Sequence, residues 1–208
     1  MATTISNAVP APVLVGGRLC LDFCNTVEYH DTDQRLDMLR DGYPRLIWWS
    51  KTLDLIDEGQ SERLLQLNDT HPDQTRIVFD QATTLREALY QLFVATIAKT
   101  APSPEWLQIL NDVVQQANNH RVLVARGGGG LSWQWRDQDA SEAMLWPIAL
   151  SAVDLLASDE LDRVRQCPGC GWLFFDQSRN RSRTWCDMQY CGNRSKARRF
   201  YQRQKSAE

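Results

Sequence analysis

The sequence predicts an α+β fold in two parts. Residues 1–160 form a mostly helical body with a small antiparallel β-sheet, and residues 161–208 form a small cysteine-rich module. Three observations predict this division. Apolar residues recur at helical spacing along most of the body, one stretch alternates instead around four glycines, and four of the six cysteines lie beyond residue 160.

The start of the body fits either a strand or a helix. Residues 1–12 contain two prolines among small residues and predict a tail. Residues 13–15 and 18–21 suggest two short extended runs around a Gly-Gly turn. The spacing of Leu21 and Cys24 equally allows a helix to begin here, so both interpretations stay open.

Helices are expected over most of the body, from the apolar spacing and from residues typical of helix starts. The longest of them carries apolar residues three, four and seven positions apart, which keeps one stripe facing a core. In chain order, the predicted helices begin at Pro44, span Ser61–Leu67 with Ser61 as the cap, span Asp73–Lys99, run from the cap Ser103 to near Asn119, and span Ser141–Ala157 with Pro147 as a kink or late start.

An alternating pattern interrupts the helices. Residues 121–126 and 131–136 flank the four glycines and predict a β-hairpin. Because side chains alternate along a strand, Leu131, Trp133 and Trp135 are expected on one face of it.

The two parts also differ in charge. The net charge is −3, but residues 1–160 hold 12 Lys and Arg against 22 Asp and Glu, and residues 161–208 hold 11 against 4. A basic segment of this kind points to an anionic partner, typically nucleic acid. Apolar runs stay well short of the roughly 18–20 residues of a membrane helix, and the N-terminus lacks the pattern of a secretory signal. We therefore expect a soluble cytoplasmic protein without a membrane partner.

The late cysteines form two pairs, Cys167 with Cys170 and Cys186 with Cys191. This spacing in an intracellular chain is typical of one structural Zn²⁺ ion held by four thiolates, a closed site without a position for a substrate. Disulfides or a redox Cys-x-x-Cys are the weaker alternatives. Cys20 and Cys24 could serve a redox or metal sensor, but buried apolar thiols explain them more simply.

The residues around the pairs predict a treble-clef-like finger. A strand-like Trp-Leu-Phe-Phe follows the first pair, a polar loop runs to Arg183, and a helical stretch follows Cys191. Ala197, Phe200 and Tyr201 are expected on the inner face of that helix. The connection Leu161–Gln166 is too short for a free linker, so we expect the finger to lie against the body.

The chain resembles a known pair of domains. The finger, with Cys-Gly-Asn-Arg at residues 191–194, resembles the CGNR-type zinc finger, and residues 16–26 (GGRLCLDFCNT) resemble the N-terminal signature of the ABATE domain that accompanies it in bacteria. This resemblance implies a stress-response transcriptional regulator whose finger binds DNA, and it is the only reason to place DNA ahead of RNA.

Basic and polar side chains of the finger are the candidate nucleic-acid contacts. They are Arg179, Arg181, Arg183, Asn193, Arg194, Lys196, Arg198, Arg199 and Arg203. Some of these arginines could instead neutralise the thiolates or hold the finger on the acidic body. Asp22 and Asn25 could line a small-molecule effector pocket, although helix capping explains them more simply.

The sequence allows three functions. The first is a DNA-binding regulator whose body senses a signal or forms a homodimer; RNA is its close alternative. The second is a zinc-stabilised module for protein interactions. The third is an enzyme, which we do not expect, because the chain lacks a P-loop, a GxGxxG and a GxSxG motif and its three histidines are isolated.

Overall fold

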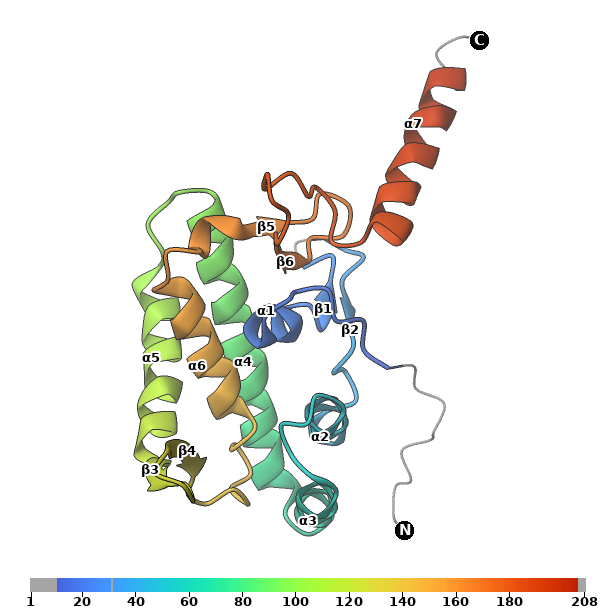
Figure 1. Cartoon of the computed structure of the whole chain (residues 1–208). Helices are drawn as coiled ribbons and strands as arrows, with labels where there is room; N and C mark the ends of the chain where they lie inside the picture. The colour runs from blue at the N-terminus through green and yellow to red at the C-terminus, as the bar shows by residue number, and fades with distance from the viewer. Residues whose placement is uncertain (1–10, 31, 206–208) are drawn as a thin grey trace.

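The computed structural model describes residues 11–30 and 32–205, and it excludes the side chains of Arg199 and Phe200. Within these limits three long helices lie side by side (Figure 1), namely α4 (Pro72–Ile97), α5 (Pro104–Asn119) and α6 (Leu145–Leu156). The short helix α1 (Leu19–Cys24) packs against α4 and α6, and α2 (Tyr43–Thr52) and α3 (Glu58–Thr70) pack against α4.

Three two-stranded antiparallel sheets complete the fold. β1 (Val27–Glu28) pairs with β2 (Leu36–Asp37), β3 (Arg121–Ala125) with β4 (Leu131–Trp135), and β5 (Val164–Gln166) with β6 (Leu173–Phe175). A 3₁₀ turn at Leu161–Arg163 leads into β5, and a π-helical turn at Met188–Gly192 leads into the last helix, α7 (Asn193–Lys205). The predicted mostly helical α+β fold is therefore confirmed.

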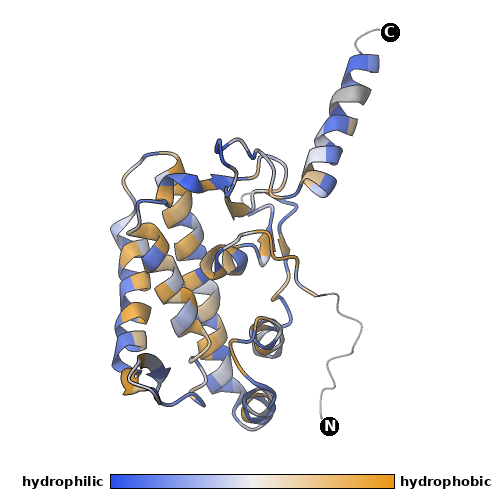
Figure 2. Cartoon of the chain, viewed as in Figure 1, coloured by the Kyte–Doolittle hydropathy of each residue, from blue (hydrophilic) through white to orange (hydrophobic). Residues whose placement is uncertain are grey.

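The core lies between the helices of the body, whose ribbons carry most of the apolar residues, whereas α7 is largely hydrophilic (Figure 2). Leu21 and Phe23 of α1 are fully buried at its centre, with Leu85, Leu89 and Phe93 of α4. None of the described helices is long and apolar enough to span a membrane.

Helix α1 decides between the two alternatives for the N-terminal stretch. The two extended runs are absent from the described residues, and residues 19–24 are helical instead. A helical turn buries Cys20, Leu21, Phe23 and Cys24 together, whereas a strand would turn alternate side chains outward.

Two predicted helix starts differ in detail. Helix α3 begins at Glu58, three residues before the predicted cap, because Asp57 and Gln60 form a capping box with two reciprocal hydrogen bonds of 2.8 Å. Ser61 lies inside the helix. Helix α6 begins at Leu145, so Pro147 occupies the first turn, where its missing N–H costs no hydrogen bond. The late-start alternative is thus correct.

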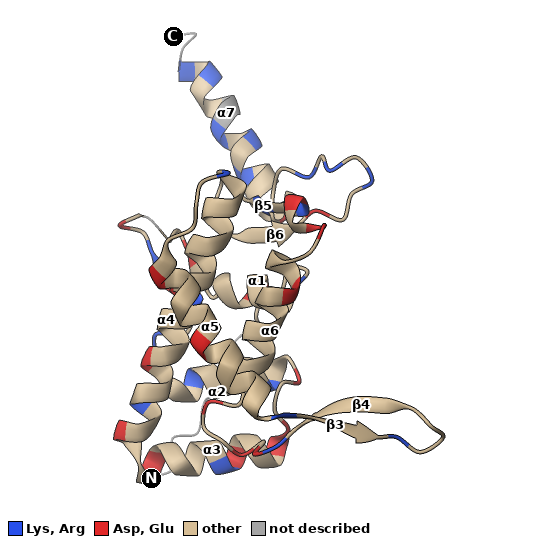
Figure 3. Ribbon diagram, turned by 90° about the vertical axis from the view of Figure 1, so that its left-hand side faces the viewer, with Lys and Arg blue, Asp and Glu red and all other residues tan. Residues whose placement is uncertain are grey.

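The β3–β4 hairpin forms as predicted and projects from the body (Figure 3). Its base is anchored by Trp135, whose ring lies 5.5 Å from that of Trp146 between centroids, and by His120, which stacks on Trp146 at 4.4 Å. The face that carries Leu131 and Trp133 is exposed beyond this base.

Candidate metal centre and nucleic-acid interface

The four late cysteines converge on one point. All four are buried and free of disulfides, and their Sγ atoms lie within 4.8 Å of one another. The Sγ atoms of Cys170 and Cys186 are 3.5 Å apart, and those of Cys186 and Cys191 are 3.7 Å apart. A tetrahedral ion with bonds of about 2.3 Å to sulfur would place its ligands about 3.8 Å apart, whereas a disulfide needs about 2.05 Å. The cluster therefore fits a four-coordinate metal ion.

Local hydrogen bonds hold the first pair of cysteines in a tight knuckle. The N–H of Cys167 donates to the carbonyl of Trp172 at 2.8 Å, and the N–H of Gly171 donates to the carbonyl of Cys167 at 2.9 Å. Gly171 has a φ of +79°, which glycine adopts without strain. The chain thus reverses at Gly171 and returns as β6.

The second pair is held by Asp187. Its Oδ1 accepts a hydrogen bond from the N–H of Tyr190 at 2.8 Å, and its carbonyl accepts one from the N–H of Cys191 at 3.0 Å. This turn leads directly into α7 at Asn193, so the position of the last helix depends on the metal ligands.

The four thiols shift one another's pKa values. Hydrogen bonds from the Cys170 and Cys186 thiols lower the pKa of Cys167 below its ordinary value. Burial first, and then the charge of Cys167, raise the pKa of Cys191. A divalent cation at the centre would let all four thiols ionise together.

Asp176 and Arg183 organise the loop between the cysteine pairs. Asp176 is fully buried and accepts hydrogen bonds from the N–H groups of Ser178 at 2.8 Å and Arg183 at 3.0 Å. The Arg183 guanidinium donates to the carbonyls of Trp185, at 2.9 Å, and Cys186, and lies 4.5 Å from the centroid of the Phe174 ring. Arg183 therefore holds the finger together through these contacts.

The other two loop arginines are exposed. Arg181 forms an ion pair with Asp162, and its φ of +50° marks a tight turn. Arg179 makes no hydrogen bond or ion pair with the described part of the chain. Only Arg179 of the three loop candidates is thus exposed and unpaired.

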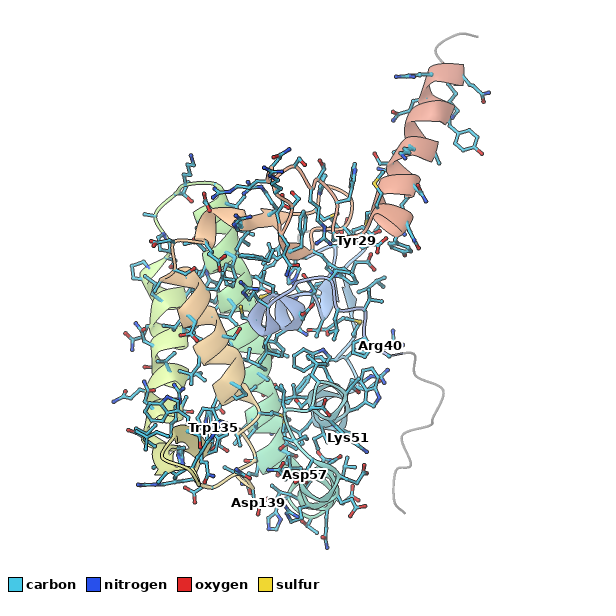
Figure 4. The ribbon with its side chains drawn as sticks, viewed as in Figure 1. Tyr29, Arg40, Lys51, Asp57, Trp135 and Asp139 are labelled. Atoms are coloured by element: carbon cyan, nitrogen blue, oxygen red, sulfur yellow. The ribbon has the colours of Figure 1, made fainter. Side chains whose placement is uncertain are left out.

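Helix α7 leaves the body at its first turn. Tyr29 lies at this junction (Figure 4), where its hydroxyl accepts a hydrogen bond from Arg194. The Arg194 guanidinium also lies 4.5 Å from the centroid of the Tyr190 ring. Beyond this turn the helix projects into solvent and carries Lys and Arg along its length (Figure 3).

The predicted inner face of α7 is wrong for the side chains that the structure describes. Ala197 is exposed, Tyr201 is 65% exposed, and Phe200 lies outside the described side chains. The finger's small core is filled instead by Trp172, Phe174 and the cysteines, without a side chain from the described part of α7. The candidates Asn193, Lys196, Arg198 and Arg203 are all exposed on this helix, and the side chain of Arg199 lies outside the described set.

Asn25 joins the finger to the body. It is 1% exposed and pairs with the backbone of Leu173, donating from Nδ2 to the carbonyl and accepting at Oδ1 from the N–H, each at 2.8 Å. The Trp172 indole donates to the carbonyl of Val27 at 2.9 Å, and the N–H of Tyr29 donates to the carbonyl of Cys170 at 2.9 Å. We call these contacts of Asn25, Val27 and Tyr29 with residues 170–173 the seam between the body and the finger. Both polar atoms of Asn25 are engaged in the seam, so we assign this residue a structural role.

Asp22 holds the Gly16-Gly17 segment. Its Oδ1 accepts a hydrogen bond from the N–H of Gly16 at 2.8 Å, and the carbonyl of Gly16 accepts one from the N–H of Phe175 at 2.8 Å. A Cβ on residue 16 would lie 2.8 Å from the backbone nitrogen of Asp22, so only glycine fits. Asp22 therefore also supports the seam with the finger.

The Asp22→Asn variant should change the pH dependence of stability. Burial raises the pKa of Asp22 from 3.8 to about 6, although hydrogen bonds from Gly16 and Val15 oppose this shift. A carboxyl whose folded pKa is raised loses stability as pH climbs from about 4 to 6. Asparagine keeps the acceptor for Gly16 without the charge. The variant should therefore gain about 1–2 kcal/mol over wild type at pH 7, a value discounted for partial exposure, and no such gain at pH 4. Urea unfolding at both pH values measures this difference, and an equal difference at both would contradict it.

Asp176 was missed as a structural centre of the finger. A signal was present, because an Asp side chain in a polar loop commonly accepts a hydrogen bond from the backbone N–H two residues further on. Tyr29 carried no comparable signal, since its contact with Arg194 joins residues far apart in the sequence.

Comparison with known proteins decides the family. The ABATE family, described as "Putative stress-induced transcription regulator", matches residues 17–159, well over half of the chain. The chain belongs to the ABATE family. Its C-terminal part matches the CGNR zinc finger over residues 163–204, which contains all four clustered cysteines. The predicted resemblance is therefore confirmed, and the ABATE protein carries a metal-binding finger.

Two curated proteins share a weaker and partial similarity. Tight junction protein 2 of Homo sapiens is 31% identical over 102 residues, which is 49% of this chain and 8% of that protein. Tight junction protein 2 of Canis lupus familiaris is 30% identical over 102 residues, which is again 49% of this chain and 8% of that protein. The chain spans about 8% of the length of these relatives, so they carry no argument about its function.

Proposed function

We propose that this ABATE protein is a DNA-binding transcriptional regulator of the bacterial cytoplasm, and that α7 is its DNA-contacting element. One observation carries the proposal. Helix α7 projects from the body, its described side chains beyond the first turn are largely exposed, and its sequence, NRSKARRFYQRQK, contains six Lys and Arg but no Asp or Glu. An exposed basic helix that forms no ion pair with an acidic side chain of the described chain offers a surface for a polyanion.

The dimensions of α7 suit a DNA groove. An α-helix with its side chains is about 10–12 Å across, which fits the major groove of B-DNA, about 12 Å wide. The 13 residues of α7 would extend about 20 Å along it. Arg198, Arg203 and Lys205 would contact phosphates, while Asn193 and Lys196 near the start of the helix would lie closest to base edges. Arg179 on the neighbouring loop would add a phosphate contact.

A single Zn²⁺ ion is the proposed cofactor. Cys167, Cys170, Cys186 and Cys191 would hold it, and their sulfur-to-sulfur distances match its tetrahedral geometry. The ion supplies folding free energy to a finger with a very small core. Four thiolates fill the coordination sphere, so we also propose that the protein is not an enzyme.

Fluorescence anisotropy with labelled nucleic acid tests this function. Metal-loaded protein should bind duplex DNA, and the affinity should fall steeply as salt rises, because each neutralised phosphate releases counterions. Single-stranded DNA and RNA of the same length serve as parallel ligands. Tighter binding to RNA would make the protein an RNA-binding regulator instead. No binding to any of the three at low salt would contradict the proposal and favour an acidic protein partner for the finger.

A further inference from the structure

The β3–β4 hairpin carries an apolar face whose large side chains are more than half exposed. Strand pairing sets Leu123 opposite Trp133 and Ala125 opposite Leu131, so these side chains share one face. Leu123 is 51% exposed, Leu131 64% and Trp133 55%. A two-stranded hairpin is only marginally stable in water without a covering layer. Beyond its anchored base, this hairpin has no such layer within the described chain (Figure 3).

A groove lies directly beside this hairpin. It has a volume of about 550 Å³ and runs between β4 and α6. Trp133 and Trp135 form one wall, and Pro147, Leu150 and Leu155 of α6 contribute apolar surface to the other. The groove is therefore wide and apolar enough to receive a β-hairpin side chain such as leucine or tryptophan.

The hairpin is basic, and the groove offers it one acidic side chain that forms no ion pair within the described chain. Residues 121–136 contain three arginines and no Asp or Glu. The groove contains Asp154 and Glu160, and also Arg18 and Arg121 of the same chain. Glu160 pairs with Arg18 at 3.1 Å, whereas Asp154 is exposed and forms no ion pair with the described part of the chain. Arg126 at the tip of the hairpin is likewise exposed and unpaired there.

We propose that the hairpin docks into this groove of a second copy of the same chain, forming a two-fold symmetric dimer. The partner follows from the placement of the two surfaces. In a two-fold dimer each chain presents the same patch to the other, so a patch must contain both complementary elements side by side. Here the hairpin itself forms one wall of the groove, which meets this condition. The exposed apolar face of each hairpin is then covered by α6 of the other copy.

The molecular mass of the protein in solution, measured in the absence of DNA, tests this dimer. Sedimentation equilibrium of the full chain over a wide concentration range should give twice the monomer mass of 23.9 kDa. Leu123→Ser combined with Trp133→Ser should weaken dimerisation by at least about 100-fold, since two large apolar side chains lose their burial. Both side chains are half exposed in one chain, so far-UV circular dichroism should show an unchanged monomer fold.

Two further variants locate the interface. Ile77→Ser is the matched control, because Ile77 is 58% exposed on α4 and does not line the groove, and it should leave the dimer intact. Asp154→Arg should weaken the dimerisation affinity about 10-fold, because the new arginine would face the basic hairpin of the other copy with a like charge. A wild-type mass of 23.9 kDa at every concentration would overturn the proposal. So would a dimer that survives the hairpin variant, is insensitive to Asp154→Arg, or is lost equally with Ile77→Ser.

Discussion

Removal of the bound metal is expected to unfold the body together with the finger. Val164, Leu173 and Phe175 of the finger hairpin belong to the same buried cluster as the helices of the body. Structural metal sites contribute roughly 10 kcal/mol or more to folding, which is comparable with the whole stability of a typical protein, about 5–15 kcal/mol. The finger cannot open without exposing this shared core, so the two parts should melt in one transition.

Thermal unfolding followed by circular dichroism measures this coupling. Chelation or Cys186→Ser should lower the melting temperature by at least about 10–20 °C, the shift that a loss of about 5 kcal/mol produces in a chain of this size. Cys20→Ala is the matched control, because it also removes a buried thiol but lies outside the metal cluster. It should keep the full metal content. A metal-free protein that retains its helical signal and its melting temperature would show that the finger is independent of the body.

Asn25→Ala is expected to be the most damaging single substitution at the seam. It leaves the N–H and the carbonyl of Leu173 buried without partners. Each buried unsatisfied group costs about 1–3 kcal/mol, so the variant should lose about 2–5 kcal/mol in the free energy of unfolding. Asn25→Asp should be at least as harmful, because it turns a carboxylate oxygen toward the carbonyl of Leu173.

Urea unfolding of the two variants tests the structural role of Asn25. Asn119→Ala, on the exposed end of α5, provides the control and should change the free energy of unfolding by less than about 0.5 kcal/mol. If Asn25 lined an effector pocket instead, its replacement by alanine would leave the unfolding free energy close to that of wild type. That result would contradict the assignment of Asn25 to the seam.

Local patterns in the sequence were enough for the elements that depend on neighbouring residues. The alternation on both sides of the four glycines predicted the hairpin, and the structure pairs Arg121 with Trp135 through Ala125 with Leu131. The spacing of the cysteines predicted which four would meet, because two short pairs can close one tetrahedron. Apolar spacing likewise placed α4 and α5 within a few residues of their observed ends.

Residues that act between distant segments could not be assigned in this way. Asn25 and Leu173 are 148 positions apart, and only the folded chain brings them together. Arg183 matched the basic pattern of a nucleic-acid contact, but the carbonyls of Trp185 and Cys186 capture its guanidinium. The inner face of α7 was expected from an amphipathic pattern, yet Ala197 is exposed and Tyr201 is 65% exposed. Pattern alone identifies an amphipathic helix without identifying what it packs against.

The salt dependence of DNA binding by an α7 variant tests the central claim most directly. Arg198→Glu combined with Arg203→Glu changes two exposed cations on the projecting helix and leaves the metal cluster and the seam untouched. We predict that the variant keeps the melting temperature of the wild type, binds duplex DNA much more weakly, and loses about two from the slope of log affinity against log salt concentration. A folded, metal-loaded variant with the affinity and slope of the wild type would show that DNA contacts another part of the protein.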